Sequence, residues 1–377
     1  MSRRRFLLAT GVGLPLTVLA APTDAGSITL NPPPGPADPG ERADLTERAI
    51  LARHVRPLWG MRAARLGAIR WPYSMVDLSF AQWDYWWQAH LLDCAVDAAH
   101  RARTPERLDR VTALAQSIRT RNLTGWTNRY YDDMGWLAVA VERTGRLLDI
   151  RFGYAADTLR TALLDGWNPS VGAVPWRIGS DYYNTPAIGP TAIALARTGE
   201  LPRARELAEF LHTRLRVPDT GLILDGIHEP GGRRDTTILT YCQGVTIGLE
   251  TELAARTGTS AHHDRAAALI AATAAELCID GVIPGAGESD SGLFMGICAR
   301  YLAEAALTLG DTTAAHLVHA SARAAWHHRA EVDGLPLFGT DWTRPITHPN
   351  HLPHDLSVQL SGWMLLEADH RLTAAGY

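Results

Sequence analysis

Apolar residues return every three or four positions along most of this chain, which is the spacing of amphipathic α-helices. Runs in which β-branched and polar residues alternate, as they do in strands, are nearly absent. The pattern therefore predicts an all-α protein with twelve helices, near residues 42–57, 79–101, 105–121, 131–146, 149–165, 184–198, 202–216, 236–256, 261–278, 290–309, 312–330 and 353–374.

The links between these helices alternate in length. Short links, such as residues 198–201 and 309–311, join helices that must pack antiparallel. The alternation predicts six helical hairpins in a ring, an (α/α)6 barrel, although a superhelical array of helical repeats is the alternative. We expect functional residues at the end where the long links gather; these links are residues 122–131, 166–184, 217–235, 280–289 and 330–352.

The N-terminus has the pattern of an export signal. A charged start precedes an apolar run of about fifteen residues, which is too short to span a membrane. Residues 2–8, SRRRFLL, resemble a twin-arginine signal, with a small-residue cleavage site at Ala20. We expect a signal peptide at 1–20, a Pro/Gly-rich linker at 21–41, a helical domain at 42–377 and a secreted or cell-envelope location. A general secretory signal or an uncleaved anchor is the alternative.

Composition narrows the possible partners. The net charge is -4 and no segment gathers basic residues, so nucleic acid is not an expected partner. A second long apolar run is absent, so no stable membrane span is expected. Four cysteines without a CxxC pair predict buried thiols, with one disulfide possible after export, rather than a zinc site; they are Cys94, Cys242, Cys278 and Cys298.

Two neighbouring carboxylates, Asp132 and Asp133, lie in the stretch NRYYDDMGWLAVA. As a purely structural feature, they could cap the start of a helix and favour its dipole. However, aromatic residues surround them, and the helix that follows is apolar nearly all round, which indicates a buried inner position. Because a buried charge is costly, we expect this pair to have a chemical use.

Glycoside cleavage needs such a pair. One carboxylic acid protonates the departing oxygen, and a second carboxylate attacks the anomeric carbon or activates water. Carboxylates about 5–5.5 Å apart give retention, and neighbouring residues at a helix start can reach that separation. Calcium or magnesium binding is a competing use, but the spacing of a calcium loop is missing. Prolines interrupt His348, His351 and His354, so no metal site is expected there, and nothing indicates a cofactor.

Five segments, in order, resemble glycoside hydrolase family 76, the α-1,6-mannanases, including its actinobacterial members. The resemblance spans roughly residues 45–370. Besides NRYYDDMGWLAVA at 128–140, it rests on YWWQAHLLD at 85–93, DYYNTPA at 181–187, YCQG at 241–244 and GLFMGICARYL at 292–302.

The resemblance implies an (α/α)6 barrel that works by retention, with Asp132 as nucleophile and Asp133 as general acid/base. Two departures stand out: Ile188 replaces an asparagine found in many members, and Met295 replaces a common lysine or asparagine. We expect both departures to remove polar groups from the cleft and to affect sugar specificity.

Eleven residues are candidates for binding the substrate. The aromatic ones could stack on sugar faces and the polar ones could bind hydroxyls; core packing, buried amides and a turn-forming aspartate are the respective alternatives. They are Trp87, Gln88, Trp126, Asn128, Tyr131, Trp176, Asn184, Asp225, Tyr241, Gln243 and Phe294.

We therefore expect an exported retaining glycoside hydrolase of the endo-α-1,6-mannanase type, acting on α-1,6-mannan or a mannan-containing glycolipid. Three alternatives remain open. The protein could be a transglycosylase on the same glycans, another (α/α)6 enzyme such as an epimerase or unsaturated-sugar hydrolase, or a non-catalytic glycan-binding wall protein.

Overall fold

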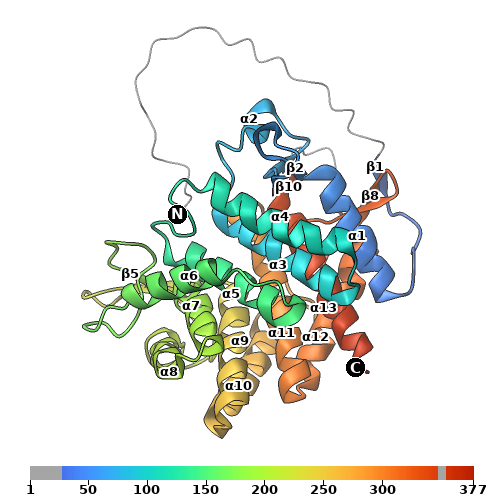
Figure 1. Ribbon diagram of the computed structural model, residues 1–377. Helices are drawn as coiled ribbons and strands as arrows, with labels where there is room; N and C mark the ends of the chain where they lie inside the picture. The colour runs from blue at the N-terminus through green and yellow to red at the C-terminus, as the bar shows by residue number, and fades with distance from the viewer. Residues whose placement is uncertain (1–27, 347–353) are drawn as a thin grey trace, which may run out of the picture.

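Twelve long helices form two concentric rings in the computed structural model, which describes residues 28–346 and 354–377 (Figure 1). Six helices are buried nearly all round and form the inner ring: α3 (Tyr85–Arg101), α5 (Tyr131–Leu148), α7 (Thr185–Arg197), α9 (Thr240–Thr257), α11 (Phe294–Leu309) and α13 (Leu356–Ala374). The other six form the outer ring: α1 (Pro39–Arg53), α4 (Pro105–Arg121), α6 (Gly153–Asp165), α8 (Leu201–Phe210), α10 (Ser260–Glu276) and α12 (Thr312–His328).

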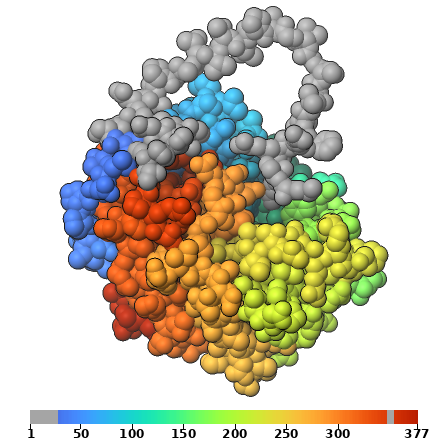
Figure 2. Space-filling view, turned by 180° about the vertical axis from the view of Figure 1, so that it is seen from behind, coloured from blue at the N-terminus to red at the C-terminus, as the bar shows by residue number. Residues whose placement is uncertain are grey.

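Each inner helix packs against its inner neighbours, and α13 packs against α3 to close the ring. Each outer helix covers the inner helix beside it in the sequence, except that α1 covers α13. The predicted (α/α)6 barrel is therefore confirmed. Helices α1 and α13 lie side by side, blue and red in Figures 1 and 2.

Glycines let the inner helices approach one another closely. A Cβ atom at Gly244 of α9 would lie 2.5 Å from the Cα atom of Cys298, and one at Gly296 of α11 would lie 2.5 Å from the Cα atom of Ser361. Such distances are far below van der Waals contact.

The helix α11 and the turn before it, Ser289–Leu309, are apolar enough to cross a membrane by composition, but most of this stretch is buried in the barrel.

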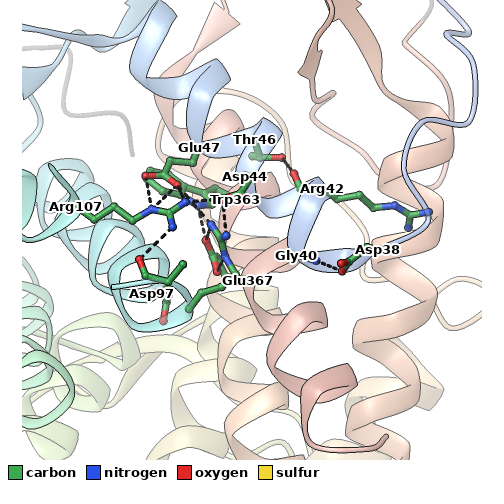
Figure 3. Close-up of polar contacts among 12 residues, drawn as sticks. Asp38, Gly40, Arg42, Asp44, Thr46, Glu47, Asp97, Arg107, Trp363 and Glu367 are labelled. Carbon is green, nitrogen blue, oxygen red and sulfur yellow. Dashed lines mark hydrogen bonds and ion pairs between the residues drawn. The ribbon is translucent and has the colours of Figure 1, made fainter. Parts of the chain in front are cut away.

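Polar side chains connect α1 and α13 with α3 and α4 (Figure 3). Arg101 of α3 binds Glu367 of α13 at 2.9 Å and Asp44 of α1 at 2.5 Å. Arg107 of α4 binds Glu47 of α1 at 2.5 Å. Of these charge-assisted bonds, one joins α3 to α13, and the other two join α1 to α3 and α4.

Helix boundaries agree with the sequence pattern to within a few residues, with two informative exceptions. The helix predicted near 79 begins at Tyr85, because Phe80 and Asp84 have positive φ angles after the short helix α2 (Met75–Leu78). The helix predicted near 236 begins at Thr240, because the preceding residues pair as a strand.

Strands are more numerous than the sequence pattern predicts, although all are short. The described residues contain four small antiparallel sheets in the links between helices. Their strands are β1 (Ile28–Leu30), β2 (Val55–Pro57), β3 (Arg65–Gly67), β4 (Arg70–Trp71), β5 (Tyr182–Asn184), β6 (Leu224–His228), β7 (Arg233–Ile238), β8 (Ala330–Val332), β9 (Leu335–Leu337) and β10 (His354–Asp355). Three single turns complete the links: η1 (Leu58–Gly60), η2 (Leu211–Leu215) and η3 (Ser289–Leu293).

The expected linker at 21–41 is wrong in its second half. Strand β1 pairs with β8, and the Trp326 indole and Arg329 guanidinium donate to the Pro34 and Pro33 carbonyls at 2.6 and 2.8 Å. The folded domain therefore includes residues 28–41, and the expected signal peptide lies outside the described residues.

Candidate active site

The N-terminal ends of the inner helices meet at one end of the barrel, together with the long links. Asp132 and Asp133 occupy the first turn of α5, and both side chains are buried. Free N–H groups and the positive end of the helix dipole stabilise carboxylates at this position. The backbone N–H of Asp133 donates to Oδ1 of Asp132 at 2.8 Å, which fixes the two groups relative to each other.

Asp132 receives a second hydrogen bond from Trp176. The indole Nε1 donates to Oδ2 at 3.0 Å. Two backbone bonds place this indole: the Tyr131 N–H donates to the Trp176 carbonyl at 2.9 Å, and the Trp176 N–H donates to the Tyr182 carbonyl at 2.7 Å. Trp176 therefore orients a carboxylate, a role that differs from the expected stacking on sugar.

Asp133 receives its hydrogen bond from a residue just before the helix. The Asn128 amide donates to Oδ2 at 2.7 Å, and its own oxygen accepts the Tyr130 N–H at 2.8 Å. This turn satisfies both ends of the Asn128 side chain, so its amide has a fixed orientation. Burial, and then the charge of Asp133, raise the pKa of Tyr85 well above its usual value, so Tyr85 is a neutral neighbour of the pair.

A cavity of about 600 Å³ opens beside Asp133. Its lining mixes indole, phenol, amide and carboxylate groups, a combination suited to the apolar faces and hydroxyls of a sugar. The residues that line it are Ala81, Gln82, Trp83, Asp84, Tyr85, Asn122, Thr124, Thr127, Asn128, Arg129, Tyr130 and Asp133. The candidate site is therefore an open cleft on the Asp133 side of the pair.

A second polar cluster surrounds Asp225 on β6. The hydroxyl of Tyr182 donates to one carboxylate oxygen of Asp225, and that of Tyr241 donates to the other at 3.3 Å. Burial raises the pKa of Asp225, and these hydrogen bonds oppose the shift. The Tyr241 ring stacks on Phe294, with centroids 3.9 Å apart.

This cluster borders the acidic pair. Asp132 is among the charges that raise the pKa of Tyr241, after burial, Asp225 and Cys242. Asn184 precedes α7 and is buried, and its Oδ1 accepts no hydrogen bond from any described residue. The structure thus brings Asn184, Asp225, Tyr241 and Phe294 to the same end of the barrel as the pair.

Two predicted binding residues have structural roles instead. Gln88 is fully buried: its oxygen accepts the Gly67 N–H at 2.8 Å, and its amide donates to the Gly67 and Trp83 carbonyls. Gln243 makes the same three bonds to Ile223 and Leu239. Both amides are satisfied by backbone groups, so neither is available to a sugar, and their assignment as ligands was wrong.

Other predicted residues are less accessible than expected. Trp87 is 2% exposed, and its indole donates to Asp290 at 3.0 Å. Trp126 is 6% exposed and packs beside Phe152. Tyr131 is 8% exposed, with its ring over Gly166. Large sugar contacts are therefore better served by Trp83, which lines the cavity; the sequence analysis missed it although it lies two residues before a matching segment.

The two departures from the family pattern also lie elsewhere than expected. Ile188 of α7 and Met295 of α11 are 0% and 1% exposed. Both pack inside the inner ring, so they replace polar groups in the core rather than in the cleft. Tyr182, which holds Asp225, is a further residue that the sequence analysis did not single out.

Metal binding finds no support in the described chain. Among residues 28–346 and 354–377, no group of three or more histidine, cysteine, aspartate or glutamate side chains could hold an ion. His348 and His351 lie outside the described residues, and His354 stacks on Trp71. The four cysteines are free thiols.

A ring of paired helices with a carboxylate pair at the start of an inner helix defines the class of this protein, a glycoside hydrolase built on an (α/α)6 barrel. The family model of glycosyl hydrolase family 76 matches residues 62–369, so the chain belongs to that family. None of the curated protein sequences compared matches the chain.

Solved structures give the same result. The GH76A α-1,6-mannanase from Salegentibacter sp. HEL1_6 is 27% identical, with 89% of this chain and 100% of that chain covered at a TM-score of 0.79. An inactive variant of that enzyme, with two consecutive aspartates replaced by asparagines, is a complex with α-1,6-mannotriose. The Lin0763 protein from Listeria innocua is 26% identical, with 90% of this chain and 99% of that chain covered at a TM-score of 0.80.

Proposed function

We propose that this chain is a retaining endo-α-1,6-mannanase that forms a covalent glycosyl-aspartate intermediate. The observation that carries the proposal is the pair Asp132 and Asp133, in which each carboxylate is held by its own donor. The resemblance to an α-1,6-mannanase supports the linkage, as does that enzyme's inactivation by replacing two consecutive aspartates.

In the first step, Asp133 protonates the glycosidic oxygen while Asp132 attacks C1 of the mannosyl unit. The C1–O bond breaks, and the departing sugar leaves as an alcohol through the cavity that Asp133 lines. In the second step, Asp133 removes a proton from water, the water attacks C1, and Asp132 departs as a carboxylate. Together, the two steps return Asp133 to the protonated acid and Asp132 to the free carboxylate.

Each part of the site has a place in this scheme. Trp176 and the Asp133 N–H hold Asp132 in one orientation for attack. Asn128 holds Asp133 toward the cleft. Asp225 and Tyr182, at the same end of the barrel as the pair, offer a carboxylate and a hydroxyl to sugar hydroxyls.

Export to the cell envelope or beyond is part of the proposal, because the N-terminal sequence resembles a twin-arginine signal. The substrate would be α-1,6-mannan or the mannan part of a glycolipid. Replacing Arg3 and Arg4 by lysine should retain the protein inside the producing cell, as fractionation would measure.

Retention gives the sharpest test of this mechanism. Proton NMR of a fresh digest of α-1,6-mannotetraose should show the α-anomer of the new reducing end first, before mutarotation. If the β-anomer forms first, water attacks directly and the covalent intermediate is wrong.

A transglycosylase is the second candidate, favoured by the size of the cavity beside Asp133. A cavity of about 600 Å³ can retain an acceptor sugar after the first product leaves. Added α-1,6-mannobiose should then yield products longer than the starting oligosaccharide, at the expense of hydrolysis.

A further inference from the structure

A second cavity lies at the opposite end of the barrel, where the inner helices end. Its volume is about 240 Å³. Every inner helix contributes to its wall: His100 from α3, Arg146 from α5, Arg197 from α7, Glu252 from α9, Glu304 from α11 and Arg371 from α13. It therefore lies on the axis of the barrel, at the far ends of the helices whose first turns form the candidate active site.

Two groups of ion pairs surround this cavity, and in each group the arginines and carboxylates are equal in number. Arg143 and Arg300 each bind both Asp93 and Asp97. In the second group, Arg197 binds Glu142, Glu252 and Glu304. Arg146 also binds Glu142, and Arg256 also binds Glu252. Five arginines thus match five carboxylates.

Arg371 is the sixth arginine and breaks this balance. Within the described chain, its guanidinium makes no hydrogen bond and no ion pair, although it lines the cavity. Burial lowers its pKa; Asp97 and Glu304 oppose this shift, and Arg143 and Arg300 add to it. A guanidinium stays protonated in proteins, and the Arg371 side chain is only partly buried, so its N–H donors can bind an acceptor that enters the cavity.

His100 lines the same cavity as Arg371 and supplies no negative charge. Burial, and then the charge of Arg371, lower the pKa of His100, so the imidazole is neutral at pH 7. His100 is exposed and Arg146 is 42% exposed, so the cavity is open to solvent beside them. An ion from solution can therefore reach Arg371.

We propose that this cavity binds a small oxyanion of the phosphate class, held by the guanidinium of Arg371. The planar fork of a guanidinium matches two oxygens of a phosphate, and the cavity is large enough for the ion with bridging waters. The ion supplies a negative partner for the one arginine of these six that has no carboxylate partner among the described residues. The site stabilises the barrel and is separate from the sugar cleft.

Thermal unfolding of the full chain, titrated with inorganic phosphate at constant ionic strength, tests the proposal. The wild-type Tm should rise saturably, by about 3 °C at high occupancy, because a ligand that binds only the folded state stabilises it. Sodium chloride at the same ionic strength should give no such rise. Isothermal titration calorimetry with phosphate should give one site per chain.

Arg371→Gln should abolish the rise in Tm, and Arg146→Gln, at the exposed side of the cavity, should weaken phosphate binding at least tenfold. The second variant keeps the test decisive if the first folds poorly. Arg205→Gln is the matched control, because Arg205 is exposed on α8, away from the cavity. If the wild-type Tm does not respond to phosphate, or if all variants respond equally, Arg371 does not bind the ion. Water and the helix ends then satisfy its guanidinium.

Discussion

The indole N–H of Trp176 should be worth one to two orders of magnitude in rate. Trp176→Phe keeps an aromatic ring in the same loop and removes only the donor that lies 3.0 Å from Oδ2 of Asp132. A hydrogen bond to a charged group contributes about 1.5–3 kcal/mol. If that energy holds the nucleophile in its attacking orientation, kcat/KM should fall about 10-fold to 150-fold.

Steady-state kinetics on a defined α-1,6-mannooligosaccharide measure this loss. We expect it in kcat, with KM little changed, because the indole positions Asp132 rather than the sugar. Trp59→Phe is the matched control: its indole donates to the Ser79 carbonyl at 2.9 Å on the exposed surface. This control should retain wild-type kinetics.

Two results would refute the reasoning on Trp176. A kcat/KM within twofold of wild type, in a variant with unchanged unfolding free energy, would mean that the N–H does not hold the nucleophile. A loss confined to KM would mean that the indole binds substrate, as the sequence analysis first expected.

Three further predictions follow from the same contacts. Asn128→Ala removes the amide that donates to Asp133 at 2.7 Å and should lower kcat by about tenfold or more, whereas an unchanged kcat would exclude a positioning role. Burial lowers the pKa of His54 to about 3, so its contribution to stability is present above pH 6.5 and is lost as the pH falls toward 3. Urea unfolding should therefore show wild type losing about 2 kcal/mol more than His54→Gln between pH 7 and pH 5; equal losses would contradict the assignment. Gly244→Ala places a Cβ 2.5 Å from the backbone of α11 and should cost about 1–3 kcal/mol, measured by urea unfolding; an unchanged midpoint would show that the helices can separate freely.

Much of the fold could be predicted because helical periodicity is a local property of the sequence. Inner helices such as α7 and α11 are apolar nearly all round, and this distinguishes them from polar outer helices such as α1 and α4. The alternating link lengths then predict the pairing. Strands such as β4 and β10 have only two residues each, too few for an alternating pattern to appear.

The candidate site was less predictable because its contacts are tertiary. Asp132 and Asp133 could be found, since two charges in an apolar stretch are anomalous by themselves. Gln88 and Gln243 look like ligands in the sequence, and only the position of distant backbone groups reveals that they are fully satisfied. Trp83 carries no sequence signal beyond its place before a helix, so its exposure to the cleft could not be predicted.

The most direct test of the proposed function is a digest of linear α-1,6-mannan by wild type and by Asp132→Ala, following reducing ends and product lengths. We expect short oligosaccharides from wild type and none from the variant, which should keep a wild-type Tm. Wild-type protein that binds the polymer without cleaving it, or a variant that cleaves as fast as wild type, would contradict the account.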